Sequence, residues 1–303
     1  MFQSVLFSAL VLLCVHGEQF DPKKGGWDYC KKSCKKEGKT YAATGCRCRQ
    51  RGTRTDIDLD QFMAFRQFIV DEHNYYRNLM ASGNESRGFA QAVADMLVVN
   101  YDLELEYLAR CYGRSFFNGD HDECRVLQNE KKAGQNLGGT SVLPKKGYGQ
   151  AQNAIRAWYK EVAYMEKSVY ERFHKLKTPI GHFTAMCWGA VDSVGCAQIY
   201  SKDPKKDKFK GANFHTHLIC DYAARKLKTN INVSQGKMLT FGPPCSKCPS
   251  DEKFKNCSTK YTSLCGELQP IPKERPYDFG NASSKICGKV YILVLAFAVL
   301  MVL

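Results

Sequence analysis

The distribution of cysteines constrains this chain more than any other feature. Fifteen cysteines occur among 303 residues, with four between residues 30 and 48 and four more between 245 and 265. The first group lies in a basic arm, residues 18–56, that has little apolar periodicity, so cross-links rather than a core of its own must hold it. The spacing of Cys245 and Cys248 also suits a zinc site, but this density in an oxidising compartment favours disulfides.

Both ends of the chain have the character of targeting segments. Residues 1–17 hold an uncharged apolar run followed by small residues, which predicts a secretory signal peptide; a buried N-terminal helix is the alternative. The apolar run 290–303 is shorter than the roughly 20 residues that cross a bilayer as a helix. With the small residues 280–284 before it, this run predicts a removable glycolipid-anchor signal, residues 282–303, with attachment at Asn281. A tilted membrane anchor is the alternative at this end.

Removal of both segments takes away Cys14 and Cys287 and leaves an odd number of cysteines. At least one thiol is then free or paired with another chain. Asn-x-Ser sequons suit the same secreted setting. The expected glycosylation sites are Asn84, Asn232 and Asn256, whereas the sequon at Asn281 competes with the anchor.

The chain is strongly basic, with a formal net charge of +14. The excess is concentrated in residues 31–39, 202–211 and 225–228, and such runs usually form solvated surface. They suit anionic lipid headgroups or acidic glycans. No nucleic-acid-binding motif accompanies them, so nucleic acid is not an expected partner.

Apolar periodicity predicts three helices. The first starts after Asp58, which forms a capping box with Gln61, and it stops at Gly83. The second covers residues 102–112 and the third covers 149–166.

Three later runs predict strands, namely residues 182–188, 194–200 and 213–222. Residues 121–141, between the second and third helices, are rich in glycine and polar side chains, which predicts a loop. Helices before and between the strands of a small antiparallel sheet indicate an α+β fold.

Composition divides the chain into segments. They are a signal peptide (1–17), the cysteine-rich arm (18–56), a main domain (57–225), a linker (226–244), a cysteine-rich hinge-like module (245–266), a stalk (267–281) and the removed anchor signal (282–303).

Several short motifs occur together in an order that resembles one family. The motifs are EHNYYR (72–77), HDECR (121–125), GQNLGG (134–139), WYKEV (158–162), GHFTAMCW (181–188) and HLICDY (217–222). This order is similar to that of the CAP superfamily of cysteine-rich secretory, antigen 5 and pathogenesis-related proteins. The cysteine arm is most similar to the antigen 5, or venom allergen, branch, and the hinge-like module resembles the hinge of cysteine-rich secretory proteins. The resemblance implies an α-β-α sandwich, the CAP domain, over residues 57–225, with a groove along one face.

The same resemblance places four side chains in the groove. Family members carry two histidines and two acids there, which fall on His121, His182 and Glu161, with Gln135 in place of the second acid. Glutamine cannot be a charged ligand, but it can hydrogen-bond a histidine. Two imidazoles and a carboxylate suit zinc or another divalent metal, so His121, Glu161 and His182 form a weak candidate metal site. A structural hydrogen-bond network is the alternative, and no cofactor is required for it.

Two motifs depart from the family pattern. Cys187 stands where an aliphatic residue is normal, and the signature that normally begins Cys-Asn-Tyr reads CDYAARKLKTN from Cys220 onward. These changes concern the rim of the groove rather than the fold.

The disulfide framework is also implied by the resemblance. Cys196 and Cys220 match a sheet-linking bridge, and three bridges tie the arm to the second helix and the loop after it. The cysteines expected in disulfides are Cys30, Cys34, Cys46, Cys48, Cys111, Cys124, Cys196, Cys220, Cys245, Cys248, Cys257 and Cys265. Cys187 is the leftover thiol, and we expect it to be buried within a strand.

The resemblance implies a non-enzymatic binding protein of the extracellular space or the outer cell surface. Its expected partner is a lipid, a sterol or an extracellular protein, and family members act in venom or saliva, defence or gamete recognition. The alternative is a metal-dependent hydrolase using His121, His182 and Glu161. With Gln135 in the acid's place, Glu161 would have to be both ligand and base, which is a poor arrangement. No serine-nucleophile motif is present, and a buried Cys187 would be inert.

Overall fold

A computed structural model describes residues 19–49, 53–210, 213–224, 236–277 and 279. The expected signal peptide and anchor signal, together with Asn232 and Asn281, lie outside the described residues. No helix within these described ranges is both long and apolar enough to span a bilayer.

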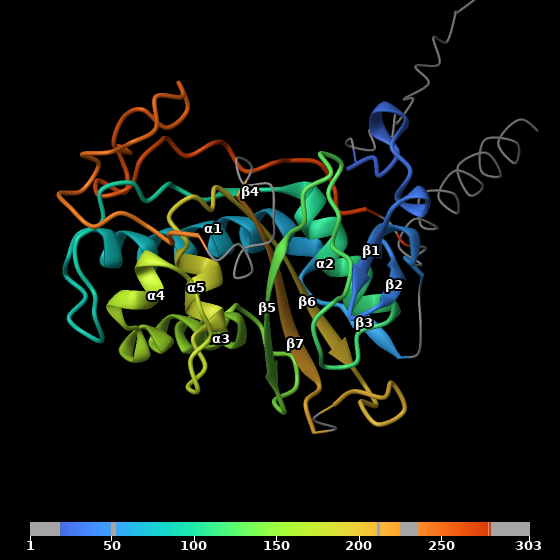
Figure 1. Cartoon of the computed structure of the whole chain (residues 1–303). Coiled ribbons are helices and arrows are strands. Elements are labelled where there is room, and N and C mark those ends of the chain that lie inside the picture. The colour runs from blue at the N-terminus through green and yellow to red at the C-terminus, as the bar shows by residue number, and fades with distance from the viewer. Residues whose placement is uncertain (1–18, 50–52, 211–212, 225–235, 278, 280–303) are drawn as a thin grey trace, which may run out of the picture.

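A five-stranded sheet forms the middle layer of the molecule (Figure 1). Its strands are β3 (Arg54–Asp56), β4 (Asn100–Tyr101), β5 (Gly134–Thr140), β6 (Ser193–Ser201) and β7 (Thr216–Ala223). The order is β3-β6-β7-β5, with β4 beside β6. All pairs are antiparallel except β4 and β6, which run parallel. Strand β5 is therefore an edge strand.

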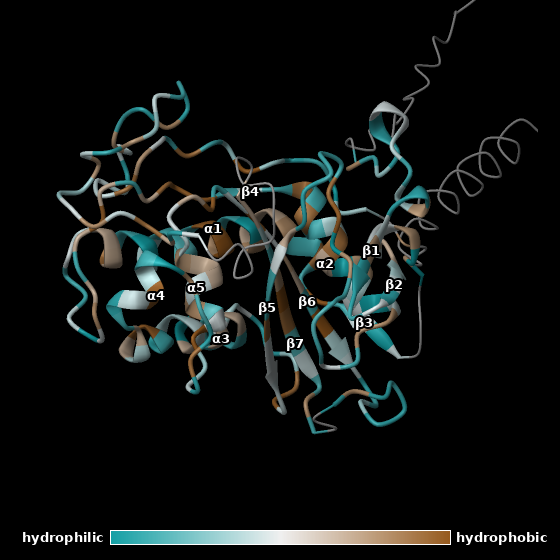
Figure 2. Ribbon diagram, in the orientation of Figure 1, coloured by the Kyte–Doolittle hydropathy of each residue, from teal (hydrophilic) through white to brown (hydrophobic). Residues whose placement is uncertain are grey.

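Helices cover both faces of this sheet. Those on one side are α1 (Phe62–Ala81), α3 (Gly149–Lys160), α4 (Lys167–Glu171) and α5 (Gly181–Cys187). The other face is covered by α2 (Leu103–Ser115). Apolar residues gather where these layers meet, while the arm and the loops at the sheet ends are hydrophilic (Figure 2). The expected α-β-α sandwich is confirmed.

Helix α2 lies directly against β6. A Cβ on Gly195 would come within 2.2 Å of the backbone nitrogen of Glu106, and one on Gly113 within 2.4 Å of Ile199 Cγ1. Glycine at these two positions lets the helix approach the sheet closely. The opposite side of α2 is covered by the arm, so nearly every residue of this helix is buried.

The three helices predicted from periodicity are α1, α2 and α3. Gly83 ends α1 as expected, with φ at +80° and its amide donating to the Met80 carbonyl at 3.1 Å. The capping box at the start is wrong, because Asp58 lies in the left-handed region and makes no side-chain cap bond. A short 3-10 turn, η4 (Leu59–Gln61), leads into the helix instead.

Two local predictions were wrong, each because tertiary packing decides the local structure. The run 182–188 is not a strand; it belongs to helix α5, whose residues from Phe183 to Cys187 are all buried. A run buried on every side has no period that separates helix from strand. The predicted loop 121–141 contains β5, where a Cβ on Gly138 would meet Ala154 Cβ at 2.8 Å. Gly138 lets β5 pack closely against α3, and this tertiary contact overrides the low strand propensity of glycine.

The arm folds around a small hairpin, β1 (Ser33–Lys36) with β2 (Lys39–Ala42). Three 3-10 turns accompany it: η1 (Lys24–Gly26), η2 (Tyr29–Lys31) and η3 (Thr44–Cys46). The Cys34–Cys124 and Cys48–Cys111 disulfides fasten it to the body.

The C-terminal segments differ from the expected linker and stalk in lying against the body. Met238 and Leu239 are buried in the main core. The Arg66 guanidinium of α1 donates to the carbonyls of Pro272 at 2.6 Å and Glu274 at 2.7 Å. These hydrogen bonds from Arg66 to backbone carbonyls explain how the proline-containing segment, which has no apolar pattern, is held against the body.

Candidate functional site

Glu161 and His182 meet at the start of α5. Glu161 begins η5 (Glu161–Tyr164), directly after α3. His182 Nδ1 donates to Glu161 Oε1 at 2.6 Å. Glu161 Oε2 accepts the backbone amides of His182 at 2.9 Å and Phe183 at 3.0 Å. The carboxylate therefore satisfies two free amides of the first helical turn, as an N-terminal cap does.

The His182 ring is further fixed by Trp158 of α3. The two rings are stacked with centroids 5.9 Å apart and planes 13° apart. The side chain remains one-third exposed while its Nδ1 is held by Glu161.

His121 binds Gln135 of β5. Its Nδ1 donates to Gln135 Oε1 at 3.2 Å, and the same oxygen accepts the backbone amide of Asp122 at 3.0 Å. Desolvation, and then the positive charge of Arg125, hold the pKa of His121 below its ordinary value. The His121 imidazole is therefore neutral at physiological pH.

Gln135 also hydrogen-bonds Asp221, a buried acid that was not among the predicted site residues. Its Nε2 donates to Asp221 Oδ1 of β7 at 3.0 Å. Burial raises the pKa of Asp221 to about 8, and the neighbouring Asp122 adds to this shift while Arg125 opposes it. Asp221 Oδ2 has no hydrogen-bond partner among the described residues. Motif HLICDY contains this acid, but only recognition of β5 as its neighbouring strand would have revealed the pairing.

Asn136 is the next residue of β5, so its side chain points to the opposite face of the sheet from that of Gln135. Its Nδ2 donates to the His182 carbonyl at 2.9 Å and to the Tyr222 hydroxyl at 3.3 Å. The Tyr222 hydroxyl donates in turn to His73 Nε2 at 2.9 Å. Neighbouring residues of β5 thus contact the His121 ring, through Gln135, and the His182 backbone, through Asn136. After desolvation and Arg125, His182 makes a smaller contribution to lowering the pKa of His121.

The expected metal ligands do not form a compact donor set. Among the described residues, only Cys245, Cys248 and Cys265 place three donor atoms within 4.8 Å of one another. Both oxygens of Glu161 already accept hydrogen bonds from α5, so this carboxylate is engaged by the helix. His121, Glu161 and His182 therefore do not fit a three-ligand metal site in this arrangement. The cysteine trio does not fit either, because its sulfurs form disulfides rather than thiolates.

All twelve cysteines expected in disulfides are bonded in the structure. The pairs are Cys30–Cys46, Cys34–Cys124, Cys48–Cys111, Cys196–Cys220, Cys245–Cys257 and Cys248–Cys265. One of the three arm bridges, Cys30–Cys46, closes within the arm itself. Cys187 is the free thiol of the described residues, fully buried in a helix rather than a strand, and burial raises its pKa to about 12. Asn84 and Asn256 are exposed, as glycan acceptors need to be.

A surface groove of about 590 Å³ lies between α3 and strands β5, β6 and β7. Its lining includes the small or apolar residues Gly138, Ala151, Ala154, Ala157, Trp158 and Leu218. Lys145 and Lys146 also line it. Gln198 is 5% exposed, and its Oε1 has no hydrogen-bond partner among the described residues. The family resemblance implied a groove along one face, but the residues that line this one could not be predicted, because they come from four separate segments.

Comparisons with known proteins agree with this fold. The family model of the cysteine-rich secretory protein family, CAP, matches residues 70–222. Venom allergen 5 of the scorpion Tityus serrulatus is 31% identical over 229 residues, covering 71% of this chain and 51% of that protein. Venom allergen 5 of Vespula flavopilosa is 30% identical, covering 69% of this chain and 100% of that protein. The chain thus spans about half the length of the scorpion relative and the whole of the wasp one.

Solved structures give the same fold. A crystal structure of Na-ASP-1 has a TM-score of 0.52 at 24% identity, covering 66% of this chain and 46% of that one. A structure of NaASP2 with Zn²⁺ has a TM-score of 0.51 at 23% identity, covering 66% of this chain and 94% of that one. The disulfide-rich body is that of a protein of the secretory pathway. The chain belongs to the cysteine-rich secretory protein (CAP) family, in its antigen 5-like, or venom allergen-like, branch.

Proposed function

We propose that this chain is a non-enzymatic binding protein of the extracellular face of the plasma membrane, tethered by a glycolipid at Asn281. The ligand is a lipid with a hydroxyl group, as in a sterol, and an extracellular protein is the second class of partner. Nucleic acid is not among the proposed partners. The groove beside α3 is the single observation that carries this proposal.

The lining of the groove suits such a lipid. Alanine, glycine, leucine and tryptophan side chains offer apolar contact, and pockets of this size bury drug-sized ligands. The unpartnered Oε1 of Gln198 is a hydrogen-bond acceptor that a ligand hydroxyl would satisfy. An ionised fatty acid has no donor for this atom, so a neutral alcohol fits better.

The engagement of Glu161 supports a role without catalysis. A metal-dependent hydrolase needs an activated water and a free base. Here Glu161 caps α5 and binds His182, while Gln135 holds the other acid position. We therefore propose that the His121, Gln135, Glu161 and His182 cleft is a structural network, and that no metal cofactor is required.

The groove is tested with radiolabelled cholesterol and the mature protein. Ala157 is exposed and lines the groove, so Ala157→Trp should fill it and abolish retention of cholesterol without a change in Tm. Ala163→Trp, at an exposed position of η5 that is not among the groove-lining residues, is the matched control. Retention should persist in EDTA. Equal cholesterol retention by Ala157→Trp and the wild type would refute the groove as the lipid site.

The tether is tested separately on cells. A phosphatidylinositol-specific phospholipase should release the native protein, and mass spectrometry of the released material would identify any lipid that travels with it. Resistance to release would contradict the glycolipid anchor and favour a tail helix.

A further inference from the structure

Residues 202–210, which follow β6, present every lysine to solvent and every apolar residue inward. Lys202, Lys205, Lys206, Lys208 and Lys210 are exposed, while Pro204, Asp207 and Phe209 are buried. The stretch stands out as hydrophilic at the end of the sheet (Figure 2). We call residues 202–210 the lysine loop.

Asp207 fastens the lysine loop to the body. Its Oδ2 accepts from Ser201 Oγ at 2.5 Å and from Thr53 Oγ1 at 3.1 Å. The backbone amide of Asp207 donates to the Asp203 carbonyl at 3.0 Å. The one buried acid of the loop is therefore committed to holding its shape.

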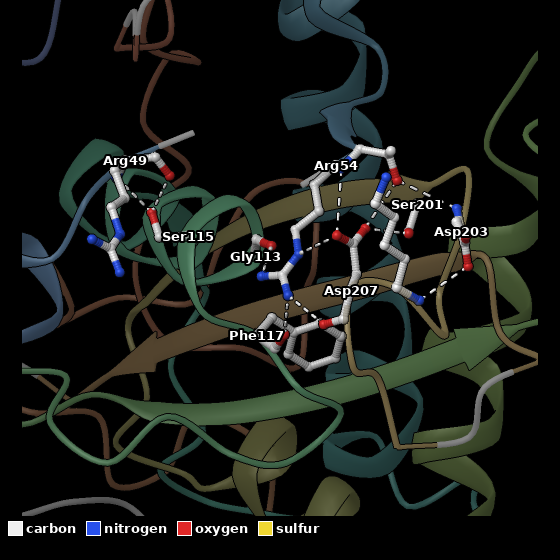
Figure 3. A network of polar contacts seen from close by, with 10 residues as sticks. Arg49, Arg54, Gly113, Ser115, Phe117, Ser201, Asp203 and Asp207 are labelled. Atoms are coloured by element: carbon white, nitrogen blue, oxygen red, sulfur yellow. Dashed lines mark hydrogen bonds and ion pairs between the residues drawn. The ribbon is translucent and has the colours of Figure 1, made fainter. Parts of the chain in front are cut away.

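Arg54 completes this anchor from β3 (Figure 3). Its guanidinium, which is buried, donates to the carbonyls of Phe117 at 2.6 Å, Asp207 at 2.9 Å and Gly113 at 3.3 Å. The Phe209 ring packs edge-on against Phe117, with centroids 5.0 Å apart. A loop fixed in this way loses little conformational entropy when it binds a partner.

The outward charge of the loop is largely uncompensated. Lys210 pairs with Asp120, but Lys202, Lys205, Lys206 and Lys208 form no ion pair with any other described residue. Several free ammonium groups held close together repel one another and attract a polyanion.

A polar hollow of about 410 Å³ lies beside these lysines. It is lined by Ser141, Lys202, Asp203, Lys205, Asn213 and His215, with Pro204. His215 Nδ1 donates to the Ser201 carbonyl at 2.9 Å, which fixes the ring at the wall of the hollow. Hydroxyl, amide and imidazole groups beside ammonium groups can bind the hydroxyls and the acidic groups of a sugar together.

We propose that the lysine loop and this hollow form a binding site for a sulfated polysaccharide. The site is separate from the lipid groove and does not depend on the proposed function. A concave polar site fits a sugar chain better than it fits the flat surface of a bilayer. The loop also lies at the end of the sheet away from residues 267–277, which run along the other side of the molecule (Figure 1). A secreted, disulfide-stabilised protein meets sulfated glycans in the extracellular space.

Heparin affinity of the full mature protein tests this proposal. The triple variant Lys202→Gln/Lys205→Gln/Lys206→Gln should bind heparin at least about tenfold more weakly than the wild type. By counterion release, its slope of log K against log salt should be about 2 smaller. The matched control is Lys31→Gln/Lys35→Gln/Lys39→Gln in the arm, which removes the same charge from exposed lysines. This control should keep the affinity and slope of the wild type.

Other polyanions separate the alternatives. Desulfated heparin should bind weakly to all three proteins, and phosphatidylserine vesicles should show no dependence on the lysine loop. Equal losses in both triple variants would mean that net charge alone governs binding, and this would overturn the site. Loop-dependent binding to vesicles without binding to heparin would overturn the glycan assignment. Thermal melting should be unchanged in both variants, because the altered side chains are exposed.

Discussion

Glu161 binds His182 twice, through the imidazole Nδ1 at 2.6 Å and through the backbone amide at 2.9 Å. One carboxylate thus fixes both the ring and the helix that carries it. Because Phe183 also donates to Oε2, the interaction is a helix cap as much as a side-chain pair.

Replacement of Glu161 should therefore reduce stability even though it removes no apolar contact. Glu161→Ala leaves two amides and an imidazole without their acceptor, and we expect a loss of about 2–3 kcal/mol in the free energy of unfolding. Urea denaturation followed by circular dichroism measures it. Glu166→Ala, at an exposed acid nearby, should be close to neutral. Wild-type stability in Glu161→Ala would show that the cap contributes nothing.

Asp221 should make stability depend on pH. Its pKa is raised to about 8 in the folded state by burial, so between about pH 4 and pH 8 the folded protein holds a proton that the unfolded chain has lost. The contribution of Asp221 to stability is therefore present at low pH and is lost as the pH rises through 8. Asp221→Asn keeps an acceptor for Gln135 but cannot titrate, so its Tm should fall less between pH 6 and 9 than that of the wild type. Parallel Tm profiles for the two proteins would contradict this assignment.

Histidines act in the opposite direction at low pH. Burial lowers the pKa of both His73 and His217 to about 4, so the unfolded chain binds protons that the folded protein does not as the pH falls below about 6.5. Stability should decline from pH 6.5 toward 4 in both proteins, and more steeply in Asp221→Asn, because the proton held by folded Asp221 offsets part of the decline in the wild type. The difference between the two slopes separates the aspartate effect from the histidine effect.

Cys187 should resist alkylation in the native protein. Cys187 is fully buried, and burial raises its pKa to about 12. The alkylating reagent therefore cannot reach the sulfur, and the reactive thiolate does not form at neutral pH. Iodoacetamide should label it only after unfolding in guanidinium without reductant, which peptide mass spectrometry would detect. An introduced exposed thiol, Ala163→Cys, should label in minutes under native conditions. Rapid native labelling at Cys187 would show that the core opens.

Arg77 should be among the most sensitive positions of the core. Its buried guanidinium donates to five backbone carbonyls, those of Leu97, Met186, Trp188, Gly189 and Val191. Arg77→Met leaves these acceptors unsatisfied, and we expect a loss of at least about 3 kcal/mol or a failure to fold. Arg156→Met, at an exposed position of α3, is the control. Comparable expression yield and urea midpoint for the two variants would contradict this role.

The sequence predicted the elements that carry a recognisable apolar pattern. Helices α1, α2 and α3 each have apolar residues at helical spacing, although the arm also covers the outer side of α2, and β6 and β7 are apolar runs. Helix α5 was missed because its residues from Phe183 to Cys187 are all buried and show no period, and strand β5 was missed because it is rich in glycine, one of which, Gly138, packs against α3. Local pattern carries no information about such packing.

The site was predictable only in part. The pairing of Glu161 with His182 was expected from family motifs rather than from spacing, since the two residues come from different elements. Asp221 and Asn136 were not expected, because their roles depend on the register of β5 with β7. The candidate metal site of His121, Glu161 and His182 stays a prediction, and the binding of Glu161 to the backbone amides of His182 and Phe183 favours the alternative of a hydrogen-bond network.

Arg66 connects three parts of the chain through one guanidinium. It binds Glu106 of α2 at 2.7 Å and, from α1, the carbonyls of Pro272 and Glu274. A pulling force applied at the C-terminal end would therefore pass into the two central helices before it could peel the last cysteine module away. Mechanical load and heat should disrupt that module and the sandwich as a single cooperative unit.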